Sequence, residues 1–463
     1  MHCPSQRFAA EKPAQMRERG RRFAAYLYGV RNTPIERKVM ANCAIVGINW
    51  GDEGKGRMVD LINQDYDVVI RYQGGSNAGH TVVNEHGKFA LHLLPSGIFR
   101  EGVVNVLGNG VALDLEALWE EMENVRKAGV AITPDMLKIS DRTALLLPYH
   151  RELDSLEEAR LADKKYGSTK RGIAPFYSDK YQKKVILAGE LFHPDYLRQH
   201  MADILEWKNL TLTKVYGAKP YSLEELMAWL EDFGGKLKPY ICNVMPYLRD
   251  AQRAGKRFLF EAQLGALRDL DYGIVPYTTS SNAVAAYAPV GAGCPNVKLD
   301  EVVGVVKAYS SCVGEGPFTC EFFGEEAERL REAGAEYGAS TGRPRRVGPI
   351  DLVATRYGVE VQGATSLALT KMDVMSYMDK VPVCAHYMLD GQQTDEFPFP
   401  CDLPRATPVI EYVEGWKTDI SGVRRFEDLP KAAQDYVLYV EKAVGCFIKY
   451  VSVGPERDAI IIR

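Results

Sequence analysis

Short runs of β-branched and aliphatic residues alternate with amphipathic stretches from Cys43 onward. The first unit is the run Cys43-Ala-Ile-Val-Gly, a glycine-rich loop and the stretch Arg57-Met-Val-Asp-Leu-Ile, which predicts a strand, a loop and a helix in that order. Further strands are predicted at 68–71, 103–107, 144–147, 257–260, 302–306, 366–370, 381–384, 447–451 and 459–462. Apolar runs of this kind between helices are typical of a large, mostly parallel sheet.

Helical periodicity recurs between these runs, and it is densest from about 150 to 255. Helices are predicted at 114–128, 150–163, 194–207, 222–233, 243–254, 350–361 and 430–444. The helix-rich region predicts a lobe over the edge of the sheet. Since no internal repeat interrupts the chain, we expect one elaborated α/β domain with helical lobes over residues 40–463.

Residues 1–39 differ from the rest because they are rich in arginine and lack apolar periodicity. Such a segment is compatible with a targeting arm, a disordered tail or a start codon assigned too far upstream. We favour the last interpretation, with Met40 as the start, because Met40 stands three residues before the first predicted strand.

Composition and charge exclude several classes of protein. A net charge of -4 and a pI near 6.1 argue against a general surface for nucleic acid or anionic membranes. No apolar run approaches the roughly 18 residues of a membrane helix, and no signal peptide is present. The nine cysteines are scattered and never spaced Cys-x-x-Cys, so neither a zinc site nor a disulfide framework is indicated. We expect a cytoplasmic protein.

The glycine-rich loop after the first strand indicates a polyphosphate site. Backbone N–H groups of a glycine loop and the N-terminus of the following helix favour an anion, and the loop contains Gly51, Asp52, Glu53, Gly54, Lys55 and Gly56. It is two residues longer than the usual Walker loop and lacks a Ser or Thr after Lys55. Asp52 is therefore the candidate ligand for Mg²⁺. A glycine turn with solvated carboxylates is the structural alternative.

A second loop, Gln73-Gly-Gly-Ser-Asn-Ala-Gly-His-Thr, follows the next predicted strand and should emerge at the same sheet edge. His80 could polarise or protonate a phosphoryl oxygen there, and Asp52 could accept a proton from a nucleophile. Each residue also has an ordinary structural interpretation: Asn77 as the cap of a turn, and His80 as a surface or core histidine.

Eight ordered motifs resemble those of the adenylosuccinate synthetase family, GTP-dependent ligases that join IMP and aspartate in AMP synthesis. They are Trp50-Gly-Asp-Glu-Gly-Lys-Gly, Asn77-Ala-Gly-His-Thr, His92-Leu-Leu-Pro-Ser-Gly, Pro276-Tyr-Thr-Thr-Ser-Ser-Asn, Gly314-Glu-Gly-Pro-Phe, Ser340-Thr-Gly-Arg-Pro-Arg-Arg, Thr370-Lys-Met-Asp and Ser452-Val-Gly-Pro. The resemblance runs from about Met40 to the C-terminus.

This resemblance implies a role for particular residues. Asp52 would be the base that takes the purine N1 proton, His80 the acid beside the transferred phosphate, and Asp52 with the Gly79 carbonyl the Mg²⁺ site. The GTP site would comprise Gly51, Asp52, Glu53, Gly54, Lys55, Gly56, Gly79, His80, Thr81, Arg345, Lys371, Met372, Asp373, Ser452, Val453 and Gly454. The IMP site would comprise Asp52, Lys55, Asn77, His80, Thr169, Lys183, Gln263, Leu264, Thr279 and Arg343.

Aspartate recognition would fall to a separate loop, and the active enzyme would be a homodimer. The implied aspartate-binding residues are Ala339, Ser340, Thr341, Gly342, Arg343 and Arg345. Arginine supplies forked donors that suit a carboxylate or a phosphate. Lys183 would reach the nucleotide of the partner subunit, and Asp373 would accept from guanine N1–H and its amino group, which adenine lacks.

Four departures from the family pattern concern the purine side. The usual Phe-Glu-Gly-Ala-Gln-Gly is here Phe260-Glu-Ala-Gln-Leu-Gly, so Leu264 stands where the family has a glutamine facing the purine. A shift of one residue can turn a side chain to the opposite face. Lys183 and Cys312 each replace an arginine, and Pro349 replaces a tryptophan.

Three hypotheses follow from these residues. The first is GTP-dependent ligation of aspartate to IMP through a 6-phosphoryl intermediate. The second is the same two-step reaction on another 6-oxopurine nucleotide or with another amino donor, suggested by Leu264, Cys312 and Lys183. The third is a GTP-binding regulator without ligase activity, which Asp52 and His80 disfavour because a binding protein needs neither.

Overall fold

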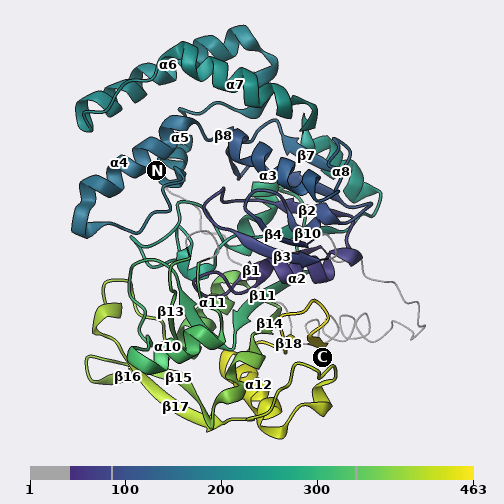
Figure 1. Cartoon of the computed structure of the whole chain (residues 1–463), viewed down its shortest axis with the longest axis vertical. Helices are drawn as coiled ribbons and strands as arrows, with labels where there is room; N and C mark the ends of the chain where they lie inside the picture. The colour runs from purple at the N-terminus through teal and green to yellow at the C-terminus, as the bar shows by residue number, and fades with distance from the viewer. Residues whose placement is uncertain (1–41, 85–86, 339–341) are drawn as a thin grey trace, which may run out of the picture. The chain divides into compact units, whose positions relative to one another are not determined.

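A ten-stranded sheet organises the described part of the chain (Figure 1). The computed structural model describes residues 42–84, 87–338 and 342–463, so the predicted extension 1–39 lies outside it. The strand order is β19 (Ile460–Ile462), β18 (Ile448–Ser452), β14 (Ser366–Thr370), β11 (Glu301–Lys307), β1 (Cys43–Gly47), β10 (Phe258–Glu261), β2 (Val68–Arg71), β5 (Val104–Leu107), β7 (Leu137–Ser140) and β9 (Ile241–Cys242). Each neighbouring pair is parallel except β18 with β19, which confirms the predicted α/β class.

Helices cover both faces of this sheet, which explains why most residues of its central strands are apolar. Side chains alternate along β1: Val46 packs in a cluster with Leu248 of α8 (Val244–Arg253), whereas Ile45 packs in a cluster with Met58 of α2 (Lys55–Ile62). All five residues of β1 are buried.

The helix-rich region forms the predicted lobe (Figure 1). Its helices are α4 (Pro148–Leu161), α5 (Ile173–Tyr181), α6 (Pro194–Leu210) and α7 (Leu223–Leu237), with α3 (Leu115–Lys127) between α7 and the sheet. Residues 144–147 contribute only the two-residue strand β8 (Ala144–Leu145), which pairs with β6 (Ala112–Leu113) away from the main sheet. The short helix α5 was not predicted.

A second, smaller sheet lies in the C-terminal half and was missed at the sequence level. It contains β12 (Tyr309–Cys312), β13 (Arg346–Asp351), β15 (Lys380–Leu389), β16 (Gln392–Thr394) and β17 (Thr407–Glu414), flanked by α10 (Gly324–Ala333) and α12 (Lys431–Val444). The run 381–384 belongs to β15 and pairs with β13 and the antiparallel β17 rather than with the main sheet. Periodicity identifies a strand, but only pairing assigns it to a sheet.

The helix predicted at 350–361 begins two residues later than expected. Ile350 and Asp351 belong to β13, and α11 (Leu352–Gln362) starts where the Asp351 carboxylate accepts a hydrogen bond from Ala354 N at 2.9 Å. The aspartate is therefore an N-cap that ends the strand and starts the helix.

The carboxyl ends of six adjacent strands carry the segments with candidate site residues. Those strands are β18, β14, β11, β1, β10 and β2, and they run parallel to one another. Ligands of open α/β sheets bind at this edge. In the described part of the chain, no helix is both long and apolar enough to cross a membrane.

A close helix–strand contact yields the first prediction. A Cβ atom on Gly358 of α11 would lie 2.0 Å from the Ile48 carbonyl oxygen, at the start of the phosphate loop. Gly358→Ala should lower the free energy of unfolding by about 1–3 kcal/mol, because α11 must move away from that oxygen. Urea unfolding measures this change.

The matched control is Gly235→Ala in α7, where a Cβ atom meets nothing within 4 Å. It should leave stability unchanged or raise it by up to about 1 kcal/mol, since alanine is the better helix former. Equal effects of the two substitutions would contradict the proposed clash.

Candidate active site

Glu53 closes the phosphate loop through its carboxylate. Gly51 N donates to Glu53 Oε1 at 2.8 Å, and Lys55 Nζ lies 2.7 Å from Oε2. Glu53 is 3% exposed, so its carboxylate stabilises the loop from inside. Gly51 and Gly54 have φ of 104° and 100°, a conformation that favours glycine. The N-terminus of α2 thus follows a loop shaped to receive an anion.

Asp52, between these glycines, points to solvent and to one arginine. Its side chain is 34% exposed, and its Oδ2 lies 3.1 Å from Arg345 Nη2. Asp52 has a positive φ of 58°, which is uncommon outside glycine. The structure thus presents a carboxylate at the cavity wall, beside an arginine from a segment almost three hundred residues away.

His80 is largely buried, with 14% of its side chain exposed, and its proton position follows from its neighbours. Arg71 Nη1 lies 3.1 Å from Nδ1, and since arginine can only donate, Nδ1 accepts and Nε2 carries the hydrogen. Burial, with the charges of Arg71, His92 and Lys55, holds the pKa of His80 well below the usual histidine value.

Glu261 Oε1 lies 3.3 Å from His80 Nε2. The two groups would form an ion pair only if the imidazole ring were protonated. Because the lowered pKa keeps the ring neutral, we describe His80 as a neutral donor. Among the described residues Nε2 is buried and makes no hydrogen bond, so this donor lacks the partner that a buried polar atom normally has. The arrangement favours polarisation of an oxygen over proton transfer from a cation.

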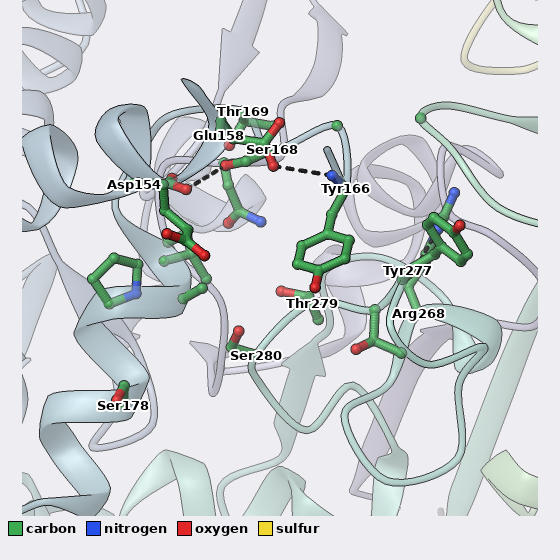
Figure 2. Close-up of a pocket in the computed structure, with 18 of the residues that line it drawn as sticks. Asp154, Glu158, Tyr166, Ser168, Thr169, Ser178, Arg268, Tyr277, Thr279 and Ser280 are labelled. Carbon is green, nitrogen blue, oxygen red and sulfur yellow. Dashed lines mark hydrogen bonds between the residues drawn. The ribbon is translucent and has the colours of Figure 1, made fainter. Parts of the chain in front are cut away.

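A cavity of about 770 Å³ brings together many of the residues predicted for the purine nucleotide (Figure 2). Its volume suits a small-molecule ligand. Seven predicted site residues line it: Gly51, Asp52, Asn77, Gly79, Thr169, Leu264 and Thr279. Asn77 Oδ1 and Thr279 Oγ1 are buried without a hydrogen-bond partner in the described structure. Buried polar atoms normally have partners, so both indicate a bound ligand.

The helical lobe supplies one wall of this cavity, and the segment 276–280 supplies the other (Figure 2). Ser168 Oγ donates to Asp154 Oδ1 at 2.6 Å, and Tyr166 N donates to Glu158 Oε1 at 3.2 Å. Both bonds anchor the loop that leads into Thr169. The rings of Tyr166 and Tyr277 meet edge to face across the walls at 6.5 Å.

The structure separates the roles of Gln263 and Leu264. Gln263 is 4% exposed, and its Nε2 donates to the carbonyls of Gly75 at 2.7 Å and His92 at 2.9 Å. Its Oε1 accepts from Gly75 N at 3.0 Å. The Gln263 amide therefore fixes the backbone of the second loop and does not line the cavity. Leu264 does line it.

The segments predicted to bind guanine follow β14 and β18. Lys371 has a φ of 61° and precedes the short turn that contains Asp373, and burial raises the pKa of Asp373. Arg57 on α2 connects this side to the phosphate loop, since its Nη1 donates to Ser452 Oγ at 2.6 Å and to the Gly454 carbonyl at 2.7 Å. The Arg57 side chain thus joins the helix after the phosphate loop to the segment predicted to close over guanine.

Comparison with known proteins decides the family. A family model described as adenylosuccinate synthetase matches residues 44–461. The chain belongs to the adenylosuccinate synthetase family. It is 47% identical over 426 residues to adenylosuccinate synthetase 2 of Pseudoalteromonas translucida, covering 92% of this chain and 100% of that protein. It is also 43% identical to the adenylosuccinate synthetase of Caldanaerobacter subterraneus subsp. tengcongensis, covering 91% and 99%.

Solved structures agree with this assignment. The fully ligated adenylosuccinate synthetase of Plasmodium falciparum superposes with a TM-score of 0.85 at 33% identity, covering 91% of this chain and 100% of that one. The succinoaminodeoxyadenylate synthetase of cyanophage S-2L, at 18% identity and a TM-score of 0.57, shares the fold. The protein is therefore a ligase of purine biosynthesis with the GTP-binding character of the adenylosuccinate synthetase family.

Some residues implied by the family resemblance lie away from the cavity. Lys183 is exposed after α5 and does not line the cavity of its own chain. Arg343 accepts at its carbonyl from Gly338 N at 2.8 Å, and Gly342 lies beside it. Ala339, Ser340 and Thr341 fall outside the described residues, as does the side chain of Thr81.

Two departures from the adenylosuccinate synthetase pattern differ in position. Cys312 Sγ lies 3.0 Å from Nη2 of Arg268, which lines the cavity. Pro349 lies in β13 opposite Tyr309 and does not line the cavity. The assignment of Pro349 to the purine side stays a prediction.

Sequence reasoning missed several residues of this adenylosuccinate synthetase site. Arg268 donates to Val313 O at 2.6 Å and fixes the segment after β12 at the cavity. Arg71 and Glu261 surround His80. Arg71 and Glu261 each end a buried strand, and a charged residue after an apolar run is a usable signal. Glu336, 0% exposed, lies just before the motif that starts at Ser340.

The lowered pKa of His80 predicts a pH-dependent stability. Below the ordinary histidine pKa of about 6.5, His80 binds a proton in the unfolded chain but stays neutral in the folded protein. Stability should therefore fall as the pH drops through that value. Relative to His80→Gln, the wild type should lose about 1 kcal/mol more between pH 7.5 and pH 5.5. Urea unfolding at both pH values measures the difference.

His193→Gln is the matched control, because His193 is exposed. This variant should keep the pH dependence of the wild type. A His80→Gln variant that loses stability with falling pH as steeply as the wild type would contradict a neutral His80.

Proposed function

We propose that this chain ligates L-aspartate to IMP at the expense of GTP, giving adenylosuccinate, GDP and phosphate in AMP biosynthesis. Membership of the adenylosuccinate synthetase family supports the reaction class. The observation that carries the proposal is the position of Asp52, a half-exposed carboxylate at the wall of a nucleotide-sized cavity beside a phosphate loop. A base at that point can meet both a purine and a polyphosphate.

In the first step Asp52 accepts the proton from purine N1, and the electron pair moves to O6. O6 attacks the γ-phosphorus of GTP, so a C6–O–P linkage forms while the bond from that phosphorus to the bridging oxygen breaks and GDP leaves. The Nε2–H of His80 donates to a phosphoryl oxygen as charge develops there. Lys55 and the N-terminus of α2 offset the negative charge of the phosphates.

In the second step the aspartate amino group attacks C6, and phosphate leaves with the C6–O bond pair. The nitrogen loses its proton, which gives adenylosuccinate. Phosphate is a far better leaving group than the original oxo group, which is why the first step precedes the second. Gly342, Arg343 and Arg345, together with 339–341, are the proposed aspartate-binding residues, because arginine forks match carboxylates.

Magnesium fits the oxygen donors of this site. Asp52 and Gly79 both line the cavity, and one carboxylate with one carbonyl is a usual protein contribution to a Mg²⁺ site. Such a site needs no cluster of acidic or histidine ligands, and among the described residues none of three or more occurs. We propose that Asp52 and Gly79 O would hold the ion, which would neutralise phosphate charge.

Guanine selectivity is proposed for Asp373, with Ser452, Val453 and Gly454 closing over the base. A carboxylate accepts from guanine N1–H and its amino group, whereas adenine leaves it unpaired. We further propose a cytoplasmic homodimer in which Lys183 enters the partner subunit's site. The exposure of Lys183, away from its own cavity, supports this arrangement.

A second candidate is the same ligation on another 6-oxopurine nucleotide or with another amino donor. Leu264 favours it, since an apolar side chain occupies the cavity wall where the family resemblance implies a glutamine. A GTP-binding regulator is disfavoured, because Asp52 and the Nε2–H donor of His80 remain in place.

The central test is phosphate release and product formation from GTP, IMP and aspartate by the purified protein. The wild type should form adenylosuccinate, and Asp52→Asn should lose about 10²–10⁴-fold in kcat, because the amide cannot accept the N1 proton. A melting temperature within a few degrees of the wild type would exclude unfolding as the cause. An Asp52→Asn variant of unchanged activity would overturn the mechanism.

Leu264→Gln tests the purine side in the same assay. A glutamine at the cavity wall can hydrogen-bond the base, so kcat/KM for IMP should rise about 5- to 10-fold, the value of one hydrogen bond. Running dGMP, GMP and XMP beside IMP separates the two candidates. Product from one of these nucleotides but not from IMP would favour the alternative substrate.

A further inference from the structure

The carboxylate of Glu336 lies where three cationic side chains of the site meet. Lys307 Nζ lies 2.7 Å from its Oε1, Lys371 Nζ lies 3.4 Å from the same oxygen, and Arg345 Nη1 lies 2.7 Å from Oε2. The Tyr309 hydroxyl also donates to Oε1. Glu336 itself is 0% exposed, so its carboxylate has no contact with bulk solvent.

Its partners come from segments that are distant in the sequence but serve the same site. Lys307 ends β11, and Lys371 opens the segment proposed to read guanine after β14. Arg345 continues from Glu336 to Asp52, whose Oδ2 lies 3.1 Å from Nη2. Glu336 therefore connects the proposed guanine segment to the proposed catalytic base through one arginine.

The backbone around Glu336 reinforces this link. Arg345 N donates to the Glu336 carbonyl at 2.9 Å, and Gly338 N donates to the Arg343 carbonyl at 2.8 Å. An antiparallel bridge joins Tyr337 and Pro344 between these two bonds. The carboxylate of Glu336 thus binds the guanidinium of Arg345, and its main-chain carbonyl binds the Arg345 backbone N–H.

Electrostatics make the carboxylate difficult to replace. Burial alone would raise the pKa of Glu336, but the charges of Lys307, Lys371 and Arg345 outweigh it and hold the pKa well below the usual glutamate value. A neutral residue there would leave three buried or half-buried cations with little compensation. Lys371, which also donates to the Gly334 carbonyl, and Arg345, which also pairs with Asp52, would then lose the partner that they share.

We propose that Glu336 is a positioning residue that fixes Lys371 and Arg345 relative to each other. Binding of guanine beside Lys371 is thereby coupled to the placement of Arg345 beside Asp52. Glu336 reaches the reaction only through these two side chains. The proposal rests on the proposed function for its use of GTP and aspartate, whereas the contacts themselves do not depend on it.

Glu336→Gln tests this role, because glutamine keeps the shape and removes the charge. Steady-state kinetics should give a kcat/KM for GTP and for aspartate that is lower by about 10- to 100-fold, the value of a hydrogen bond to a charged group. The KM for IMP should change less than threefold. Glu336→Asp keeps the charge and should recover part of the loss.

Tyr309→Phe is the matched control, since it removes a hydrogen bond to the same carboxylate but no charge. It should leave both values of kcat/KM within about twofold of the wild type. A KM for IMP that rises as much as the KM for GTP and for aspartate, with Glu336→Asp no better than Glu336→Gln, would overturn the proposal in favour of a purely structural role. Wild-type kinetics in Glu336→Gln would overturn it equally.

Calorimetric titration with GDP keeps this test separate from the proposed reaction. Glu336→Gln should weaken GDP binding about 10-fold, and Lys371→Ala should weaken it no further in the double variant, because both act through the same contact. Full additivity of the two substitutions would overturn the coupling. Failure of the wild type to ligate aspartate to IMP would overturn the proposed function alone.

Discussion

The parallel pairing of β1 between β10 and β11 is the constraint on which the site depends. Ile45 is paired with Glu261 on one side and with Val303 on the other, so the chain leaves all three strands at the same edge. Parallel strands cannot be joined by tight turns. The phosphate loop, the Gln263 segment and Lys307 therefore come from distant parts of the sequence and converge only when the sheet forms.

Three buried carboxylates lie at that edge, and each has its own set of donor or cationic neighbours. Glu53 accepts from the phosphate loop and Lys55, Glu261 lies among Arg71 and His80, and Glu336 faces three cations. Each carboxylate is at most 3% exposed. Fixed charges in such surroundings interact more strongly than in water, and none of them must reorganise when a charged ligand enters.

The pair Gln263 and Leu264 illustrates how local geometry assigns roles. Gln263 is turned under the second loop by its bonds to Gly75 and His92. Leu264 has a φ of 59°, and its Cα would lie 3.3 Å from a Cβ on Gly51. That close approach puts its apolar side chain beside the phosphate loop, so the wall next to Asp52 is partly apolar.

The sequence by itself determined the α/β class, the helical lobe and the motif segments, because these depend on local periodicity and on residue chemistry at fixed spacing. It identified Asp52, Asn77, Thr169 and Thr279 as site residues, and the structure places these four at one cavity. Only the tertiary structure decided the second sheet, the proton position of His80, the opposite directions of Gln263 and Leu264, and the convergence on Glu336. Those features depend on which strands pair and on which charges are buried together, and no local pattern encodes either.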